Sequence, residues 1–167
     1  MSQTDYARRQ VLRVFPASAL ALLLAACAPQ ALPPEYGSLR GIEVIDLREG
    51  EGAPAQAGDR LRMHYRGYLY DQRAEGGRGP KFDDSHARGR AFEFVLGAGQ
   101  VIRGWDEGLQ GLKPGGQRLL RLGPEFGYGE RGAGRAIPPD ASLLFEVERL
   151  ADERQSNTDQ VHPGLDQ

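Results

Sequence analysis

Short stretches in which apolar and polar residues alternate recur through the middle of the chain. They fall at residues 42–44, 60–65, 92–96 and 143–147. In the stretch 60–65, for example, three apolar residues alternate with two arginines and a histidine. A period of two is that of a β-strand, and one polar face is typical of an antiparallel sheet with one side in water. The pattern therefore predicts a series of short antiparallel strands.

One segment departs from this period. Between residues 101 and 112 the apolar side chains recur at helical spacing, and Asp106 and Glu107 occupy the opposite side. The run Lys-Pro-Gly-Gly at 113–116 stops the pattern, as expected at the end of a helix. One short helix among five or six strands predicts an α+β fold in which the antiparallel sheet curls over the helix.

The first 27 residues have the organisation of an export signal. Arg8, Arg9 and Arg13 precede an apolar run at 14–26, which is shorter than the roughly 20 residues that span a bilayer. The sequence Leu-Ala-Ala-Cys that ends at Cys27 resembles the lipobox of bacterial lipoproteins. That resemblance implies a signal peptide at 1–26, cleavage before Cys27 and a lipid on its thiol. A plain secretory peptide is the alternative, and the arginine pair leaves twin-arginine export open beside the general route.

This organisation predicts where the protein works. Residues 27–40 contain the lipidated cysteine and a Pro-rich tether, residues 41–150 form the folded domain, and 151–167 form a polar, disordered tail. We expect a lipid-anchored protein of the cell envelope that faces the periplasm or the extracellular side. The sequence leaves open whether an inner or an outer membrane holds it. It contains no segment of dimerising length, which predicts a monomer.

Composition and charge exclude several classes of function. The 167 residues carry 21 Lys and Arg against 23 Asp and Glu, and the scattered cations argue against a nucleic-acid-binding domain. One cysteine and three histidines without metal-ligand spacing predict neither a metal centre nor another cofactor. Phosphate-loop motifs and a nucleophile elbow are missing from the sequence, and His64 in mid-strand is interpreted as structural.

A set of aromatic and branched side chains lies beside glycines in the predicted domain, and a hydrophobic core is the simpler interpretation of the set. It consists of Tyr65, Phe82, Phe92, Val101, Ile102, Trp105, Tyr128, Ile137 and Phe145. The order of the surrounding motifs is more specific: HYRG at 64–67, KFDDS at 81–85, FEFVLG at 92–97, VIRGWDEG at 101–108, PEFGYG at 124–129 and IPPDASLLFEV at 137–147. In this order the motifs resemble FKBP-type peptidyl-prolyl cis-trans isomerases over residues 41–150.

The resemblance implies a strongly bent sheet wrapped on the helix, with an apolar pocket between them. Trp105 would be the floor of this pocket, with three phenylalanines as its walls. The backbone N–H of Ile102 and the hydroxyl of Tyr128 would hold substrate carbonyls, and Asp83 would lie beside Tyr65 at the rim. The implied catalytic residues are Phe82, Asp83 and Tyr128, and the implied substrate-binding residues are Tyr65, Phe92, Val101, Ile102, Trp105, Ile137 and Phe145. Whether Asp83 is structural or directly catalytic stays open.

The implied activity is rotation about X–Pro peptide bonds, which assists protein folding. A non-catalytic module or chaperone that holds proline-containing segments on the same fold is the alternative. Partners would be proline-containing segments of envelope proteins, macrolide inhibitors of the family and a membrane. Two features depart from the compact family pattern. Residues 75–80 predict a flexible loop inserted beside the pocket, and Ala133 and Ala136 replace bulkier residues.

Overall fold

The computed structural model describes Tyr36 and residues 39–151. The predicted signal peptide, Cys27, most of the predicted tether and nearly all of the predicted tail therefore lie outside the described residues. Within the described ranges, the structure contains no helix that is long and apolar enough to cross a membrane.

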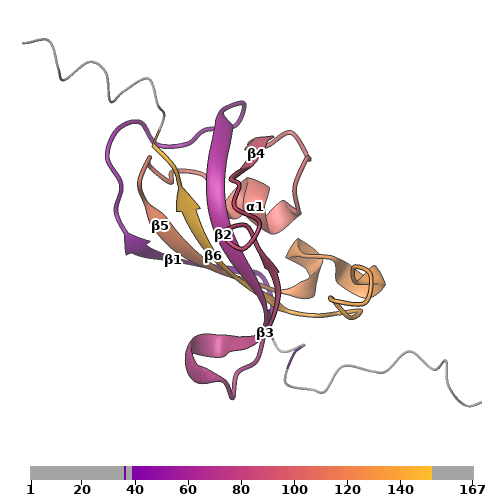
Figure 1. Cartoon of the computed structure of the whole chain (residues 1–167). Coiled ribbons are helices and arrows are strands. Elements are labelled where there is room, and N and C mark those ends of the chain that lie inside the picture. Colours follow the sequence, from indigo (N-terminus) through magenta and orange to yellow (C-terminus); the bar gives the residue numbers. More distant parts are fainter. Residues whose placement is uncertain (1–35, 37–38, 152–167) are drawn as a thin grey trace, which may run out of the picture. The chain divides into compact units, whose positions relative to one another are not determined.

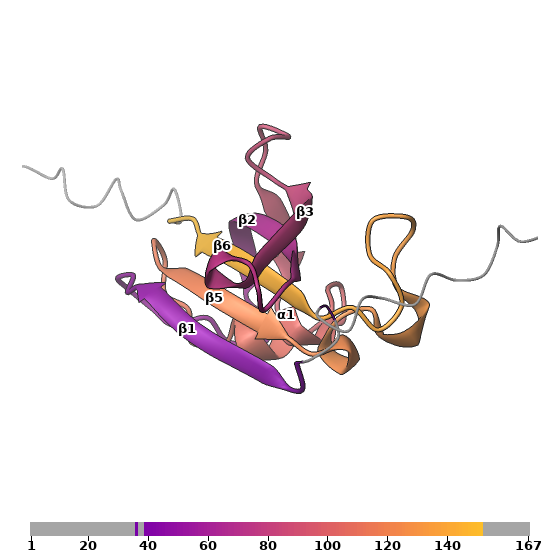
Figure 2. The same ribbon diagram turned by 90° about the horizontal axis from the view of Figure 1, so that it is seen from below.

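A six-stranded antiparallel sheet forms the body of the described domain (Figure 1). Its strands are β1 (Ile42–Arg48), β2 (Arg60–Tyr70), β3 (Arg78–Asp84), β4 (Phe92–Val95), β5 (Gln117–Leu122) and β6 (Leu143–Arg149). They are arranged in the order β1-β5-β6-β2-β3 (Figure 2), and β4 pairs with the first half of β2. The α-helix of this region is α1 (Arg103–Gly108), and three single 3₁₀ turns accompany it, at Glu75–Gly77, Pro124–Phe126 and Gly129–Arg131. The predicted α+β class is confirmed.

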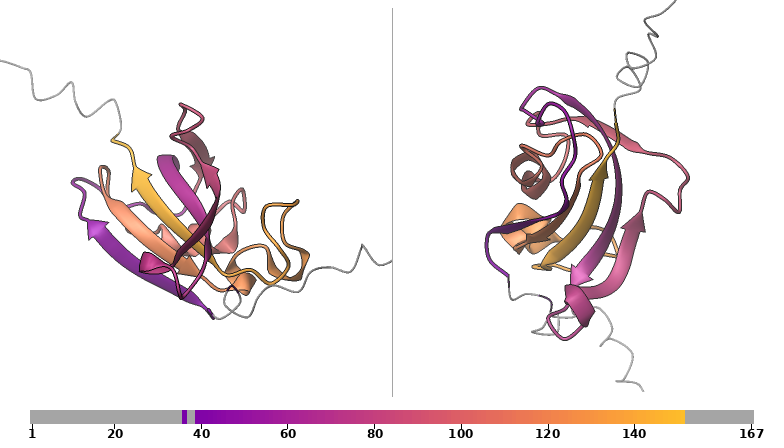
Figure 3. Two further views of the ribbon diagram at one scale, coloured as in Figure 1. Left: turned by 60° about the horizontal axis from the view of Figure 1, so that its bottom comes forward. Right: turned by 90° about the vertical axis from the view of Figure 1, so that its left-hand side faces the viewer.

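Helix α1 lies on the inner side of the curved sheet (Figure 3). The predicted alternation in β2 holds, because Leu61, Met63 and Tyr65 are buried against the helix side while the residues between them are partly exposed. Strand β6 is different, since Leu143, Leu144 and Phe145 are all buried. The side chain of Leu144 lies on the outer face of the sheet, near the turn at Glu75–Gly77. Apolar burial on both faces thus fixes β6 in the middle of the sheet.

The helix is shorter than the helical spacing of 101–112 predicts. It covers only the middle of that segment, with Ile102 and Leu109 as its two caps. The chain then turns at Gly111, whose φ of 78° favours glycine and whose N–H donates to the carbonyl of Ala55. Leu112 nevertheless remains buried, so the apolar spacing indicates the buried face correctly and the helix length incorrectly.

A buried arginine fixes the helix to the sheet. Arg118 of β5 is 7% exposed and donates to the carbonyls of Gly108 and Gln110, at 2.8 and 2.9 Å. Its guanidinium also pairs with Asp46 of β1, the edge strand, at 2.6 Å. The last carbonyls of a short helix have no partner within the helix, and Arg118 supplies one. The helix that carries Trp105 is therefore held at its C-terminal end.

The segment 75–80, predicted as a flexible loop, has regular structure instead. Residues 75–77 form a 3₁₀ turn, and strand β3 begins at Arg78, with register shifts where it pairs with β2. Gly76 and Gly77 both have positive φ, which is the conformation that lets this turn reverse the chain. The extra residues thus lengthen the β2–β3 hairpin.

Candidate active site

A cavity of about 360 Å³ opens between helix α1 and the sheet. It is lined by Tyr65, Phe82, Asp83, Phe92, Gln100, Val101, Ile102, Trp105, Tyr128 and Phe145. Nine of these ten belong to the predicted set of site residues, drawn from β2, β3, β4, α1, β6 and two loops. The structure therefore brings together side chains that are up to 80 residues apart in sequence, Tyr65 and Phe145.

One predicted site residue lies elsewhere. Ile137 does not line the cavity; it is 5% exposed and packs in the hydrophobic core. Its backbone forms an isolated bridge with Ala133, which closes the loop that follows the turn at Gly129–Arg131. Residues 75–80, predicted to lie beside the pocket, do not contribute to this lining. The insertion extends the β2–β3 hairpin away from Phe82 and Asp83.

Trp105 forms the floor of the cavity. Its side chain is 4% exposed, and Tyr65 and Phe145 meet it edge-on with ring centroids at 5.0 and 5.4 Å. Edge-to-face contacts of this kind are favourable and restrict ring rotation. The backbone also holds Trp105 in place, because its N–H donates to the carbonyl of Ile102 in the first turn of α1.

Phenylalanines form the walls. Phe82 and Phe145 contact each other edge-on at 5.6 Å, and Gly67 of β2 lies directly beneath both rings. Phe92 stacks on Phe94 at 5.6 Å and still leaves 37% of its own surface exposed. An exposed ring beside a cavity offers apolar surface to a ligand.

Charged and polar groups gather at one side of the rim. The hydroxyl of Tyr65 donates to Asp83 at 2.5 Å, and the guanidinium of Arg88 donates to Asp83 and, at 2.9 Å, to the Tyr65 oxygen. Partial burial of Asp83 raises the pKa of its carboxyl, but the hydrogen bonds from Tyr65, Arg88 and the N–H of Asp84 outweigh burial and hold that pKa below its usual value. Burial raises the pKa of Tyr65, and its bond to the Asp83 carboxylate raises it further. Asp83 is therefore a fixed carboxylate at neutral pH.

The cavity also carries hydrogen-bond donors that have no acceptor in the described part of the chain. The Tyr128 hydroxyl is one, and the backbone N–H of Ile102, just ahead of α1, is another. Burial raises the pKa of Tyr128, and the charge of Asp83 adds to the rise, so the phenol remains protonated and able to donate. Both donors border the cavity and are available to a ligand carbonyl.

Two residues of the site escaped prediction. Gln100 lines the cavity, and its side-chain oxygen accepts the N–H of Val95 at 2.9 Å, which closes the loop between β4 and α1. Arg88 orders the Tyr65–Asp83 pair from the turn after β3. Gln100 directly precedes Val101 and Ile102, so it would have been included if the predicted set had begun one residue earlier in this segment. No sequence signal separates Arg88 from the other arginines, which make up 19 of the 21 cations because only two lysines occur.

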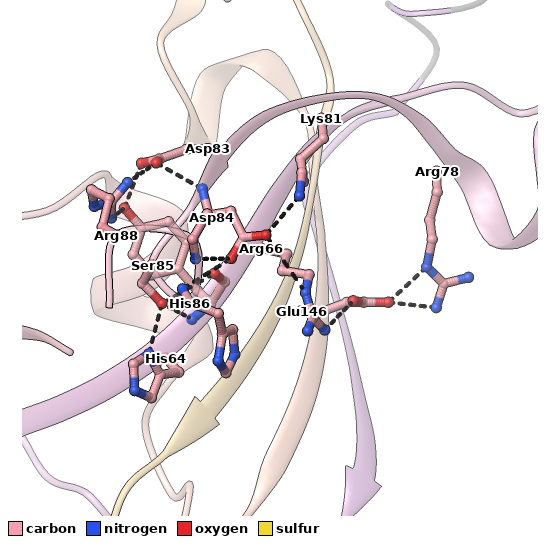
Figure 4. A network of polar contacts seen from close by, with 12 residues as sticks. His64, Arg66, Arg78, Lys81, Asp83, Asp84, Ser85, His86, Arg88 and Glu146 are labelled. Carbon is pink, nitrogen blue, oxygen red and sulfur yellow. Dashed lines mark hydrogen bonds and ion pairs between the residues drawn. The ribbon is translucent and has the colours of Figure 1, made fainter. Parts of the chain in front are cut away.

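A polar network supports the rim from behind (Figure 4). The fully buried Ser85 hydroxyl accepts the N–H of Tyr65 at 2.8 Å and lies 2.9 Å from Nδ1 of His64. Asp84 accepts from Lys81 at 2.6 Å and from the N–H of His86, and these bonds lower the pKa of Asp84 to about 2. His64 lies outside the cavity, as its interpretation as a structural residue expects.

The geometry suits a ligand that is apolar at its centre and carries carbonyls at its edges. Comparison with known proteins identifies the family. A family model described as FKBP-type peptidyl-prolyl cis-trans isomerase matches residues 51–150. The chain belongs to this family. The motif order at 64–147 thus indicated the correct family, and strand β1, which precedes the matched residues, completes the FKBP-type sheet by pairing with β5.

Relatives of this FKBP-type domain occur in distant organisms. The chain is 46% identical over 110 residues to FK506-binding protein 1 of Dictyostelium discoideum, an alignment that covers 66% of this chain and 96% of the relative. It is 47% identical over 110 residues to the FK506-binding protein of Neisseria meningitidis serogroup B, which covers 66% and 94% of the two chains. Among solved structures, the crystal structure of AtFKBP13 matches with a TM-score of 0.57 and 35% identity over 66% of this chain and 92% of that one.

Proposed function

We propose that this FKBP-type domain accelerates cis–trans rotation about X–Pro peptide bonds in the cavity above Trp105. The observation that carries the proposal is the shape of the site: a cavity lined by aromatic rings, with Trp105 4% exposed at its floor and two hydrogen-bond donors at its edge that have no acceptor among the described residues. The reaction makes and breaks no covalent bond, so it requires no nucleophile or cofactor. The chain instead has to lower an intrinsic barrier of about 18–20 kcal/mol.

An apolar cavity can lower this barrier by differential binding. The planar amide is strongly dipolar, whereas the twisted amide has lost conjugation and carries less charge on its oxygen. Moving the bond from water to an apolar site therefore costs the planar form more than the twisted form. The proline ring would rest on Trp105, and the Ile102 N–H and Tyr128 hydroxyl would hold neighbouring carbonyls, so that one side of the bond turns while the other is fixed. Asp83 would keep Tyr65 in place.

Isomer exchange on a short Leu-Pro peptide tests the activity. The wild-type chain should accelerate exchange, Phe82→Ala and Asp83→Ala should reduce the acceleration strongly, and Tyr128→Phe should reduce it modestly. Tyr70→Phe is a matched control, because Tyr70 lies on β2 outside the cavity lining. Equal rates for wild type and all three site variants would disprove the pocket assignment. Binding of the peptide by folded wild type without acceleration would favour the non-catalytic module instead.

The relatives suggest a class of inhibitor. Two of them carry the name FK506-binding protein, and the cavity here offers a ring-lined surface to a macrolide. We propose that FK506 competes with peptide for this cavity. Titration of FK506 into the exchange assay should then inhibit it, and Phe82→Ala should weaken the inhibition.

We further propose that the domain acts in the cell envelope as a lipid-anchored monomer. The support is the sequence of residues 1–27, in which the sole cysteine of the chain ends the apolar run. Several acyl chains on Cys27 would hold the protein firmly, since a single chain anchors only marginally. Cys27→Ser should release the protein from the membrane fraction and abolish the added lipid mass in the intact-protein spectrum. Membrane retention of that variant would contradict the anchor.

A further inference from the structure

A second cavity adjoins the first across its aromatic rim. Its volume is about 400 Å³, and its lining consists of Tyr65, Arg88, Arg90, Ala91, Phe92 and Glu93. Tyr65 and Phe92 line both cavities. A polypeptide whose proline sits on Trp105 can therefore pass over the exposed Phe92 ring and enter the second cavity. The Phe92 ring centroid lies 6.0 Å from that of Trp105. An extended chain advances about 3.3 Å per residue, so a residue about two positions from the proline reaches Phe92.

The charged side chains of the second cavity differ in whether they have an ion-pair partner. Arg88 is paired with Asp83, and Glu93 lies 3.4 Å from Nε of Arg62, so both of these charges are compensated. Arg90 is exposed and has no hydrogen bond or ion pair with any residue in the described part of the chain. One uncompensated guanidinium therefore faces a cavity that a bound polypeptide can reach. Arg88 adds a second guanidinium, held 5.4 Å above the Tyr65 ring.

We propose that the cavity lined by Arg88 and Arg90 is a substrate subsite for a carboxylate side chain, Asp or Glu, near the isomerised proline. A guanidinium binds a carboxylate through two parallel N–H···O bonds, which makes Arg90 suited to this ligand. The field of the whole protein does not produce the preference, because the formal net charge is −2 and repels an acidic peptide. The preference is local to Arg90. The inference rests on the proposed isomerase function.

The test compares Glu and Gln at each of three positions on either side of proline in a Leu-Pro host peptide, with the full-length chain at low salt. At one position or more, wild type should show a kcat/KM about two- to fivefold higher for the Glu peptide, as an exposed ion pair predicts. Arg90→Gln should bring this ratio to one, Arg90→Lys should retain part of it, and high salt should reduce it. Arg60→Gln is the control of equal charge change, since Arg60 pairs with Val95 at the far end of β4 and lines neither cavity.

Two results would overturn the subsite: a Glu-to-Gln ratio of one at every position in wild type, or the same ratio in wild type and Arg90→Gln. Failure of the isomerase function would look different, because no peptide would then be accelerated. In that case the Glu-to-Gln ratio is measured as a ratio of dissociation constants by fluorescence. Trp105 is the sole tryptophan and forms the floor of the cavity, so its emission reports occupancy directly.

Discussion

At the scale of single residues, Asp83 shows what a contact network adds to a sequence. The motif KFDDS places a carboxylate at the site but leaves open whether it acts structurally or in catalysis. In the structure, Tyr65, Arg88 and the Asp84 N–H all donate to Asp83. These three bonds favour a role for Asp83 in positioning its neighbours over a role in proton transfer. Arg88 could not be predicted, because its role depends on the turn after β3 and not on any local pattern.

These contacts predict how activity depends on pH. Because the folded-state pKa of Asp83 lies below the usual value of about 3.9, its charged form and the stability that it contributes persist above that value and are lost as the pH falls through the folded-state pKa. The exchange rate per enzyme should therefore be constant from pH 8 down to about pH 5 and should fall only below about pH 4. Exchange measured by NMR, with near-ultraviolet circular dichroism to confirm folding, checks this. A midpoint above pH 5 that Asp83→Asn removes would show that Asp83 is not held ionised.

At the scale of elements, the period of the sequence predicted some strands and missed others. Alternation indicated β1, the first half of β2, β4 and β6. Strand β5 gave no such signal, because Arg118 occupies the same face as the core residues Leu120 and Leu122. Arg118 is buried there among carbonyls, and only a tertiary contact makes that favourable. Strand β3 contains Gly79 and Pro80, which argue for a loop in sequence, yet β3 is the outermost strand of its side of the sheet, where proline is tolerated.

Gly67 in the middle of β2 gives the prediction at this scale. A Cβ at this position would lie 2.7 Å from two carbons of the Phe82 ring and 3.0 Å from Phe145, so Gly67→Ala has to displace both walls of the cavity. We expect a loss of about 1–3 kcal/mol in the free energy of unfolding, as in other overpacked cores, and at least a tenfold loss of kcat/KM. Urea unfolding and isomer exchange measure the two effects.

A second variant separates the effect of crowding on stability from its effect on activity. Phe82→Leu in the Gly67→Ala background reduces the crowding and should recover part of the unfolding free energy without recovering activity, because the wall remains changed. Wild-type exchange rates in Gly67→Ala alone would show that the positions of these rings do not matter.

At the scale of the whole molecule, the motif order indicated the family, and nine of the ten predicted site residues line one cavity. No sequence pattern marked the ends of the packed region. Ile137 was assigned to the cavity because its motif lies beside the site, but its backbone closes a loop with Ala133 instead. Tyr36 and Leu39 lie in the segment predicted as a tether, and both contact the domain. A proline-rich sequence predicts a linker when its contacts are unknown. Here the contacts are with residues about 100 positions later in the chain, around Ser142, so no local pattern could show them.

The contacts of Tyr36 predict where a minimal domain must begin. The carbonyl of Tyr36 accepts the N–H of Ser142 at 2.7 Å, the N–H of Leu39 donates to the Ser142 hydroxyl at 3.2 Å, and the Tyr36 ring packs against the core. Ser142 is fully buried, so a chain that starts at residue 41 leaves its N–H without a partner. We expect residues 41–167 to be about 2–4 kcal/mol less stable than residues 28–167, from one unpaired buried donor and the lost packing of one aromatic ring. Urea unfolding of the two chains measures the difference.

Tyr36→Ala in the longer chain should keep the hydrogen bond and lose only the packing, so its stability should lie between those of the two chains. Equal unfolding midpoints for all three chains would show that the folded domain begins at β1. Isomer exchange should remain in each folded chain, because none of these contacts borders the cavity.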